Sequence, residues 1–256
     1  MSSSALDRPP LDRRGFLRAA GGMGAAVLLA GGLAAPTAEA AAPRTIAFSG
    51  RTWTVKGYKS RVGPGPNYFS SSPNNVWVDS SGALHLKITK SAGKWYCAEV
   101  ICNEAPGYGT YRFSLDSAVG GWDPSVVLGL FTWSDALAYH NQEIDIEFAR
   151  WGSAANLNAQ YVVQPYDTVG NMVRFNEPAA TQTLHSFTWR ADSVAFSSLD
   201  RDTGGLISGW TYSGGDVPVF AGANPRMNLW LFQGRAPVSG KAVEVVISGF
   251  EHVPLV

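Results

Sequence analysis

Short stretches in which apolar and polar residues alternate recur along the chain, and they limit its fold more than any other feature. In "ALHLKITK", Leu84, Leu86 and Ile88 are every second residue, and such side chains lie on one face of a β-strand. No segment after residue 40 keeps a helical period for the length of an average helix, about 12 residues. Similar stretches, separated by Gly, Pro, Ser and Asp clusters, are "GTYRFSLDSA", "SVVLGLFTW", "NLNAQYVVQ", "HSFTWRADSVAF", "MNLWLFQG" and "AVEVVISGFEHV". The sequence therefore predicts an all-β sandwich of two antiparallel sheets.

The first forty residues have a different pattern. Arg13 and Arg14 precede a short apolar run rich in Gly and Ala, and the run is followed by the small-residue site Ala38–Glu39–Ala40. A membrane anchor is the alternative, but the run is shorter than the ~20 apolar residues that a span needs. We expect residues 1–40 to be a cleaved twin-arginine export signal. Residues 41–256, which contain no later run long enough for a membrane span, would then form one secreted domain.

Composition excludes several classes of function. The net charge is zero and only 16% of residues are charged, so we expect neither nucleic acid nor an anionic membrane as a partner. A chain of about 216 residues fits one β-domain with a full core, and we expect a monomer. Cys97 and Cys102 are five positions apart, and an odd difference in position directs their side chains to opposite faces of a strand. Free, buried thiols are therefore favoured over a disulfide.

The stretch "EIDIEF" places three carboxylates, Glu143, Asp145 and Glu147, on alternate residues, and the residues between and after them are apolar. On a strand, neighbouring carboxylates would be ~6.6 Å apart at the backbone. At an effective dielectric constant near 20, two charges at that distance repel by about 2.5 kcal/mol. An exposed acidic strand is the alternative interpretation, but it gains nothing from this repulsion.

Crowded carboxylates suit acid–base chemistry. Repulsion between like charges favours keeping one carboxyl protonated while another stays ionised. Hydrolysis of a glycosidic bond needs one acid and one ionised carboxylate on the two sides of the bond. The pattern therefore predicts a glycoside hydrolase with Glu143, Asp145 and Glu147 as its catalytic residues.

The stretch "EIDIEF" also resembles the E-x-D-x-E signature of glycoside hydrolase family 16, in the form found in bacterial lichenases. The resemblance implies a concanavalin A-like β-jelly-roll fold with the acidic strand in the floor of an open cleft. It implies that Glu143 is the nucleophile, Asp145 its electrostatic helper and Glu147 the acid/base. It further implies a retaining mechanism by double displacement, with no cofactor required.

Other stretches extend the resemblance over much of residues 41–256: "WYCAEV", "LGLFTW", "LNAQYV" and "MNLW". By this resemblance the residues that would contact substrate are Glu99, Trp133, Asn158, Gln160, Asn228 and Trp230. Glu251, near the C-terminus, would be a residue of a structural calcium site such as some relatives have, and no other metal is expected.

The sequence departs from the lichenase pattern at three places. Ile101 replaces a cleft Arg, Asn141 replaces an aromatic residue before the nucleophile, and a second Trp after "MNLW" has no counterpart. These departures leave the three carboxylates intact. From the carboxylates and the resemblance we expect a secreted endo-β-glucan hydrolase acting on a polysaccharide with β-1,3 and/or β-1,3-1,4 linkages. The alternatives are a family 16 enzyme for another polysaccharide, a transglycosylase, or a non-catalytic carbohydrate-binding protein on the same fold.

Overall fold

A computed structural model describes residues 43–139 and 142–255 of the chain. The expected export signal, with Arg13 and Arg14, and Asn141 lie outside the described residues. The strands are β1 (Thr45–Phe48), β2 (Arg51–Val55), β3 (Tyr68–Phe69), β4 (Val76–Val78), β5 (Leu84–Ser91), β6 (Lys94–Cys102), β7 (Gly109–Leu115), β8 (Val126–Trp133), β9 (Ile144–Ala149), β10 (Ala159–Val163), β11 (Met172–Phe175), β12 (Thr183–Trp189), β13 (Val194–Asp200), β14 (Leu206–Tyr212), β15 (Asn224–Leu231) and β16 (Val243–Pro254). The described helices are two single 3₁₀ turns, η2 (Leu137–Tyr139) and η3 (Phe232–Gly234).

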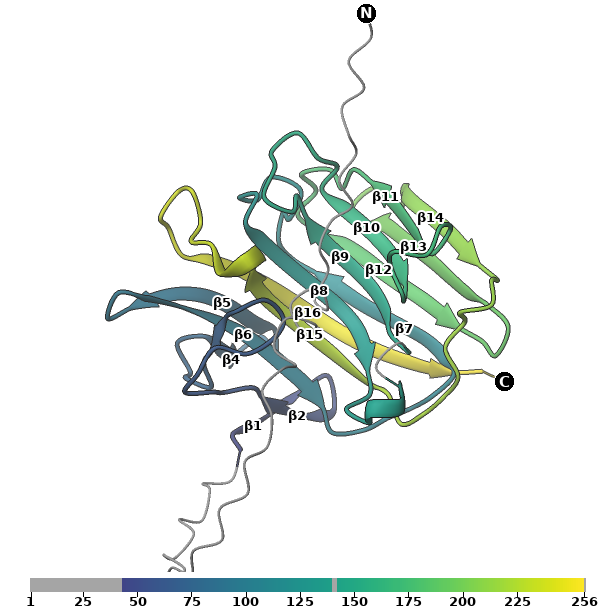
Figure 1. The fold of residues 1–256 in the computed structure, drawn as a ribbon, viewed down its shortest axis with the longest axis horizontal. Helices are drawn as coiled ribbons and strands as arrows, with labels where there is room; N and C mark the ends of the chain where they lie inside the picture. Colours follow the sequence, from purple (N-terminus) through teal and green to yellow (C-terminus); the bar gives the residue numbers. More distant parts are fainter. Residues whose placement is uncertain (1–42, 140–141, 256) are drawn as a thin grey trace, which may run out of the picture.

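The strands form two layers, as the alternating pattern predicts (Figure 1). The first layer has the order β11-β10-β9-β8-β15-β6, with β2 and β3 on the outer edge of β6. The second layer has the order β5-β16-β7-β12-β13-β14, with β4 also paired to β5. All strand pairs are antiparallel except β3 with β6. The fold is thus the expected all-β jelly-roll sandwich.

The core lies between the two layers. In β5, Leu84, Leu86 and Ile88 are all fully buried, whereas the residues between them are half-buried. Contacts across the layers include Phe148 of β9 with His185 of β12, whose ring centroids are 4.7 Å apart. The apolar faces predicted from the sequence are therefore the two inner faces of the sandwich.

A tight hairpin links the two layers between β5 and β6. Its turn residues, Ala92 and Gly93, both have positive φ values of 45° and 77°. Two such residues between paired strands make a type I′ turn, which matches the natural twist of a hairpin. Register pairs Ser91 with Lys94 on either side of the turn, so the hairpin is short and closed.

Strand β6 carries both cysteines. Cys97 and Cys102 are buried and free, which confirms the prediction from their odd separation. Burial raises the pKa of the Cys97 thiol to about 12, so this thiol is not a reactive nucleophile. Among the residues that the structure describes, no helix is long and apolar enough to cross a membrane.

Candidate functional site

The acidic stretch forms a strand, as predicted, and this strand lies in the interior of the first layer. Strand β9 lies between β8 and β10 in the first layer, and Glu143 immediately precedes it. Ile144, Ile146 and Phe148 belong to the hydrophobic core. Because side chains alternate along a strand, Glu143, Asp145 and Glu147 lie on the opposite, outer face of this layer.

Cross-strand register aligns predicted site residues in one row with Glu147. Gln160 of β10 is its partner on one side, and Gly129 of β8 is its partner on the other. Gly129 is in turn paired with Asn228 of β15, and Asn228 is paired with Glu99 of β6. Gly129 adds no side chain to this row. Four residues expected to form a cleft thus lie in one row across the five neighbouring strands β10, β9, β8, β15 and β6.

Side-chain amides of Gln160, in β10, and Gln164, directly after β10, bind two of the three carboxylates. Gln160 donates from Nε2 to Glu147 Oε2 at 2.9 Å, and Gln164 donates from Nε2 to Asp145 Oδ2 at 3.0 Å. Trp151 donates from its indole nitrogen to Gln160 Oε1 at 3.2 Å. This last bond orients the amide so that its NH₂ group faces Glu147. The arrangement presents an acceptor carboxylate in a defined direction, as catalysis by a carboxyl pair needs.

At the other end of the row, Glu99 is bound by two donors. Lys56 Nζ lies 2.8 Å from Glu99 Oε2, and Asn228 Nδ2 donates to the same oxygen at 3.3 Å. Glu99 is buried, and a buried carboxylate with a cation beside it is compensated in charge. Lys56 also donates to the carbonyl oxygen of Gly63 at 2.8 Å, which ties the loop after β2 to the row.

A pocket of about 360 Å³ lies beside the acidic strand. Trp133, Phe131 and Glu99 are among its lining residues, and Phe131 is the register partner of Asp145. The Trp133 indole nitrogen donates to Asp135 Oδ1 at 3.1 Å, and this bond fixes the orientation of the ring. Trp133 thus lines this pocket, and its role in stacking on a sugar ring stays a prediction.

An arginine from a neighbouring strand lies beside Ile101. Ile101 of β6 stands where the lichenase pattern has an Arg, and its cross-strand partner is Arg226 of β15. Both residues line the 360 Å³ pocket. The Arg226 guanidinium donates to Asp135 at 2.6 Å and to Asn224 at 2.9 Å. A guanidinium is therefore present in the pocket, although it comes from another strand.

Two further predicted contact residues, Trp230 and Asn158, contact other parts of the protein. Trp230 is 1% exposed, and its ring centroid lies 6.2 Å from that of Trp151. Its indole nitrogen has no hydrogen-bond partner within the described part of the chain. Asn158 donates to the carbonyl oxygens of Gly120 and Glu177 at 2.8 and 2.9 Å and accepts from the Glu177 backbone at 2.6 Å. The whole amide of Asn158 is thus used to join two loops.

Sequence reasoning missed four residues of the site: Gln164, Lys56, Asp135 and Arg226. Gln164 could have been found, because it continues the period of two from Gln160 along "QYVVQ". The other three come from the loop after β2, the loop after β8 and β15, and only the folded register brings them to the pocket.

The expected calcium residue, Glu251, forms an ion pair with Arg112 at 2.7 Å. Among residues 43–139 and 142–255, no group of three or more His, Cys, Asp or Glu side chains is arranged to hold a metal ion.

Solved structures of bacterial β-glucanases are similar to this chain. A Bacillus licheniformis β-glucanase has a TM-score of 0.62 and 21% identity, covering 79% of this chain and 92% of that chain. The fold is that of the lichenases. A prokaryotic β-1,3-1,4-glucanase (lichenase) from a mouse hindgut metagenome has a TM-score of 0.59 and 19% identity, covering 79% of this chain and 93% of that chain. The resemblance expected from "EIDIEF" is therefore confirmed at the level of the fold.

The lichenase fold is also shared by a protein described as a pseudoenzyme. An immunostimulatory antigen and pseudo β-1,3-glucanase of Mycobacterium tuberculosis has a TM-score of 0.59 and 17% identity, covering 77% of this chain and 88% of that chain. No family model and no curated protein matches the chain. Since fold alone does not decide activity, the function must be argued from the residues of the site.

Proposed function

We propose that residues 41–256 form a secreted endo-acting β-glucan hydrolase that retains the configuration of the sugar. The observation that carries the proposal is the acidic strand. All three carboxylates are present on the outer face of β9, and amides hold two of them. The likeness to β-glucanases supports glycoside hydrolysis as the kind of reaction.

In the proposed mechanism Glu143 attacks the anomeric carbon while Glu147 gives its proton to the leaving oxygen. The covalent glycosyl–enzyme bond that forms is then broken by water, and Glu147 takes the proton of that water. Asp145, between the two on the same face, acts through its charge on both neighbours. Gln160 and Gln164 keep Glu147 and Asp145 in place during both steps.

A catalytically silent carbohydrate-binding protein is the second candidate, and the fold shared with the pseudo β-1,3-glucanase favours it. The two candidates make opposite predictions for turnover. Purified protein incubated with β-1,3-glucan, β-1,3-1,4-glucan, xyloglucan, agar and carrageenan should release shorter oligosaccharides from at least one β-glucan. Binding without product from any of the five polysaccharides would favour the silent protein.

The roles of the two glutamates can be separated with azide. Glu143→Ala and Glu147→Ala should each lose at least about 10³-fold in kcat, because each removes half of the double displacement. Azide added to Glu143→Ala should give a glycosyl azide of inverted configuration, since the anion fills the space left by the nucleophile. With Glu147→Ala and a substrate whose leaving group needs no proton, azide should give the retained product.

The matched control is Glu251→Ala, which removes an exposed glutamate of the second layer. It should keep parental turnover. If both alanine variants of the acidic strand also kept near-parental turnover, that strand would not be the active site.

A further inference from the structure

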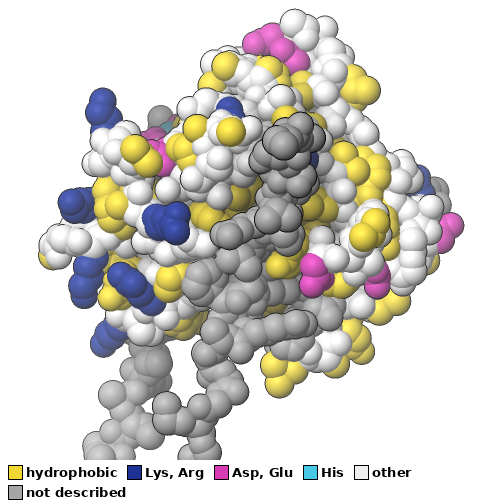
Figure 2. Space-filling model, turned by 45° about the horizontal axis from the view of Figure 1, so that its top comes forward, with side chains coloured by type: hydrophobic (Ala, Val, Ile, Leu, Met, Phe, Trp, Pro, Cys, Tyr) yellow, Lys and Arg dark blue, Asp and Glu magenta, His cyan; other side chains and the backbone are white. Residues whose placement is uncertain are grey.

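The charges of the chain are divided unevenly along its length. Residues 43–98 contain eight Lys or Arg and one acidic residue, whereas residues 99–255 contain eight Lys or Arg and sixteen acidic residues. In the space-filling view, Lys and Arg side chains gather at the left, over β5, β6 and the loops beside them (Figure 2). A chain of zero net charge thus has one strongly basic end.

Five of these eight cations, Arg44, Lys59, Arg61, Lys90 and Lys94, have no ion pair among the described residues. Lys59 and Arg61, in the loop between β2 and β3, and Lys94, at the start of β6, are exposed and form no ion pair with any described residue. We call these three residues the basic end. Lys56, three positions before Lys59 in the same loop, differs because it forms an ion pair with Glu99.

Two members of the basic end share one aromatic ring. The Arg61 guanidinium lies 5.3 Å and the Lys94 ammonium 5.0 Å from the ring centroid of Tyr68. Tyr68 in turn contacts Tyr96, with centroids 5.9 Å apart. Two cations held near each other repel, and the ring offsets that repulsion only in part. An anion bound close to these cations would offset the repulsion.

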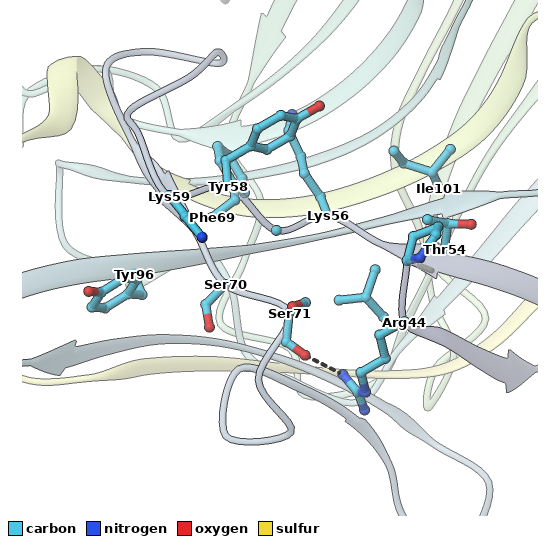
Figure 3. Close-up of a pocket in the computed structure, with 13 residues that line it drawn as sticks. Arg44, Thr54, Lys56, Tyr58, Lys59, Phe69, Ser70, Ser71, Tyr96 and Ile101 are labelled. Atoms are coloured by element: carbon cyan, nitrogen blue, oxygen red, sulfur yellow. Dashed lines mark hydrogen bonds between the residues drawn. The ribbon is translucent and has the colours of Figure 1, made fainter. Parts of the chain in front are cut away.

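The basic end adjoins a second, larger pocket. This pocket has a volume of about 850 Å³, and Lys59 and Tyr96 are among its lining residues. Figure 3 shows Lys56, Tyr58 and Lys59 on one side of it, opposite Arg44 and Ser71. Tyr58 is 55% exposed, so an amphipathic ring is open to a ligand at this point.

The larger pocket continues into the candidate active site. It shares Lys56, Tyr58 and Ile101 with the 360 Å³ pocket. That pocket reaches Phe131, the register partner of Asp145 on the acidic strand. A polymer lying against the acidic strand can therefore extend through the two adjoining pockets to Lys59 of the basic end.

We propose that the basic end binds acidic substituents, carboxylates or sulfate esters, of a polysaccharide whose backbone lies in the cleft. The proposal rests on the proposed function for the placement of the backbone, and it adds a substrate class, that of β-glucans bearing acidic groups. Positive charge supplies attraction to the substituents, and the exposed tyrosine supplies a platform for a sugar ring between them.

The test is binding, so it does not depend on turnover. Three probes share one backbone: unsubstituted β-1,3-glucan, carboxymethylated β-1,3-glucan and sulfated β-1,3-glucan, and the last two separate the two sources of negative charge. Affinity electrophoresis with the full chain carrying Glu143→Ala gives a Kd for each polymer. The same variant is then combined with Lys59→Gln/Arg61→Gln, or with Arg190→Gln/Lys241→Gln as a control. Each pair removes one Lys and one Arg, and both control residues are exposed.

We expect at least one charged glucan to bind more tightly than the unsubstituted one, with a preference that falls as salt is added. Lys59→Gln/Arg61→Gln should raise the Kd for that glucan by roughly threefold to tenfold and leave the Kd for the unsubstituted glucan unchanged. The control pair should change neither. Equal weakening by both pairs, equal affinity of the parent for all three polymers, or equally tight binding of a single-stranded DNA would overturn the proposal.

A separate measurement of hydrolysis distinguishes failure of the proposed hydrolase function from failure of the substrate-binding proposal. Hydrolysis of the unsubstituted and charged glucans is measured in parallel with residues 143, 59 and 61 intact. If a charged glucan binds at the basic end but no glucan is cleaved, the substrate-binding proposal stands and the hydrolase proposal fails. Cleavage without any preference for charge gives the reverse result.

Discussion

Individual polar side chains around β9 and β10 have two different tasks. Gln160 and Gln164 bind carboxylates of the acidic strand. Asn158, two residues before Gln160, instead forms hydrogen bonds with the backbone N–H and carbonyl oxygen of Glu177 and with the carbonyl oxygen of Gly120. Asn158 is 6% exposed, so the backbone groups that it satisfies have little access to water. Its contribution is therefore to stability.

Asn158→Ala tests this division of tasks. The substitution removes three hydrogen bonds and leaves buried backbone groups without partners, so the free energy of unfolding should fall by roughly 2–4 kcal/mol. The kcat/KM of the folded fraction should stay within about twofold of the parent. Chemical denaturation and kinetics on the same samples measure the two quantities.

Asn228→Ala is the matched comparison, because Asn228 binds Glu99 in the row that ends at the acidic strand. It should lower kcat/KM at least tenfold with a smaller loss of stability. A severe loss of kcat/KM in folded Asn158→Ala would instead place Asn158 in contact with substrate.

At the scale of elements, the segment between β11 and β12 places a buried carboxyl group against the second layer. Neither carboxylate oxygen of Glu177 has a hydrogen-bond partner among the described residues, and one lies 3.8 Å from His185 Nε2. Burial, with a smaller effect of the Asp200 charge, raises the pKa of Glu177 to about 7. Burial lowers the pKa of His185 to about 3. Both pKa values favour a neutral pair over an ion pair near pH 6.

Glu177 should make stability depend on pH. In the fold it keeps its proton up to about pH 7, whereas a free glutamate loses it near pH 4.5. Between these values the folded state binds more protons, so the free energy of unfolding contributed by Glu177 falls as pH rises. His185 has the opposite slope below about pH 6.5, because the unfolded chain then binds the extra proton. The two effects nearly cancel between about pH 4.5 and 6.5.

Glu177→Gln removes the pH-dependent contribution of Glu177 to the free energy of unfolding and leaves that of His185. The stability of the variant minus that of the parent should increase from pH 4.5 to pH 7.5, by roughly 3 kcal/mol, and be flat below pH 4.5. Urea unfolding at a series of pH values gives this difference directly. A difference that does not change with pH would show that Glu177 ionises normally in the fold.

At the scale of the whole molecule, we propose that the chain has two parts with separate tasks. The strands that the structure describes lie between Thr45 and Pro254. Arg13 and Arg14 precede this part, and we propose that they direct export of the protein to the outside of the cell. A polysaccharide too large to enter a cell requires such a location for its hydrolase.

The export proposal predicts a sharp effect of a conservative change. Arg13→Lys/Arg14→Lys keeps both charges but removes the arginine pair, and it should leave most of the protein in the cytoplasm as the uncleaved precursor. Immunoblots of cell and medium fractions measure this, and Arg8→Lys serves as the control. Unchanged secretion of the double variant would show that the arginine pair is not read.

The sequence by itself determined the features that depend on neighbouring residues. Side chains alternate along a strand whatever its partners are, so "ALHLKITK" and "EIDIEF" revealed their inner and outer faces without any tertiary information. The same rule predicted that the two cysteines of β6 are free and that the three carboxylates share one face. These inferences need only the period of two.

Only the tertiary structure decided which strands became neighbours and at what register. Arg226 lies beside Ile101 because β15 inserts between β6 and β8, although the two residues are far apart in sequence. Lys56 reaches Glu99 in the same way, from the end of β2. Asn158 shows the remaining limit. It shares the face of Gln160 in the strand pattern, but at a strand end the packing of nearby loops, rather than the alternation, determines what a side chain contacts.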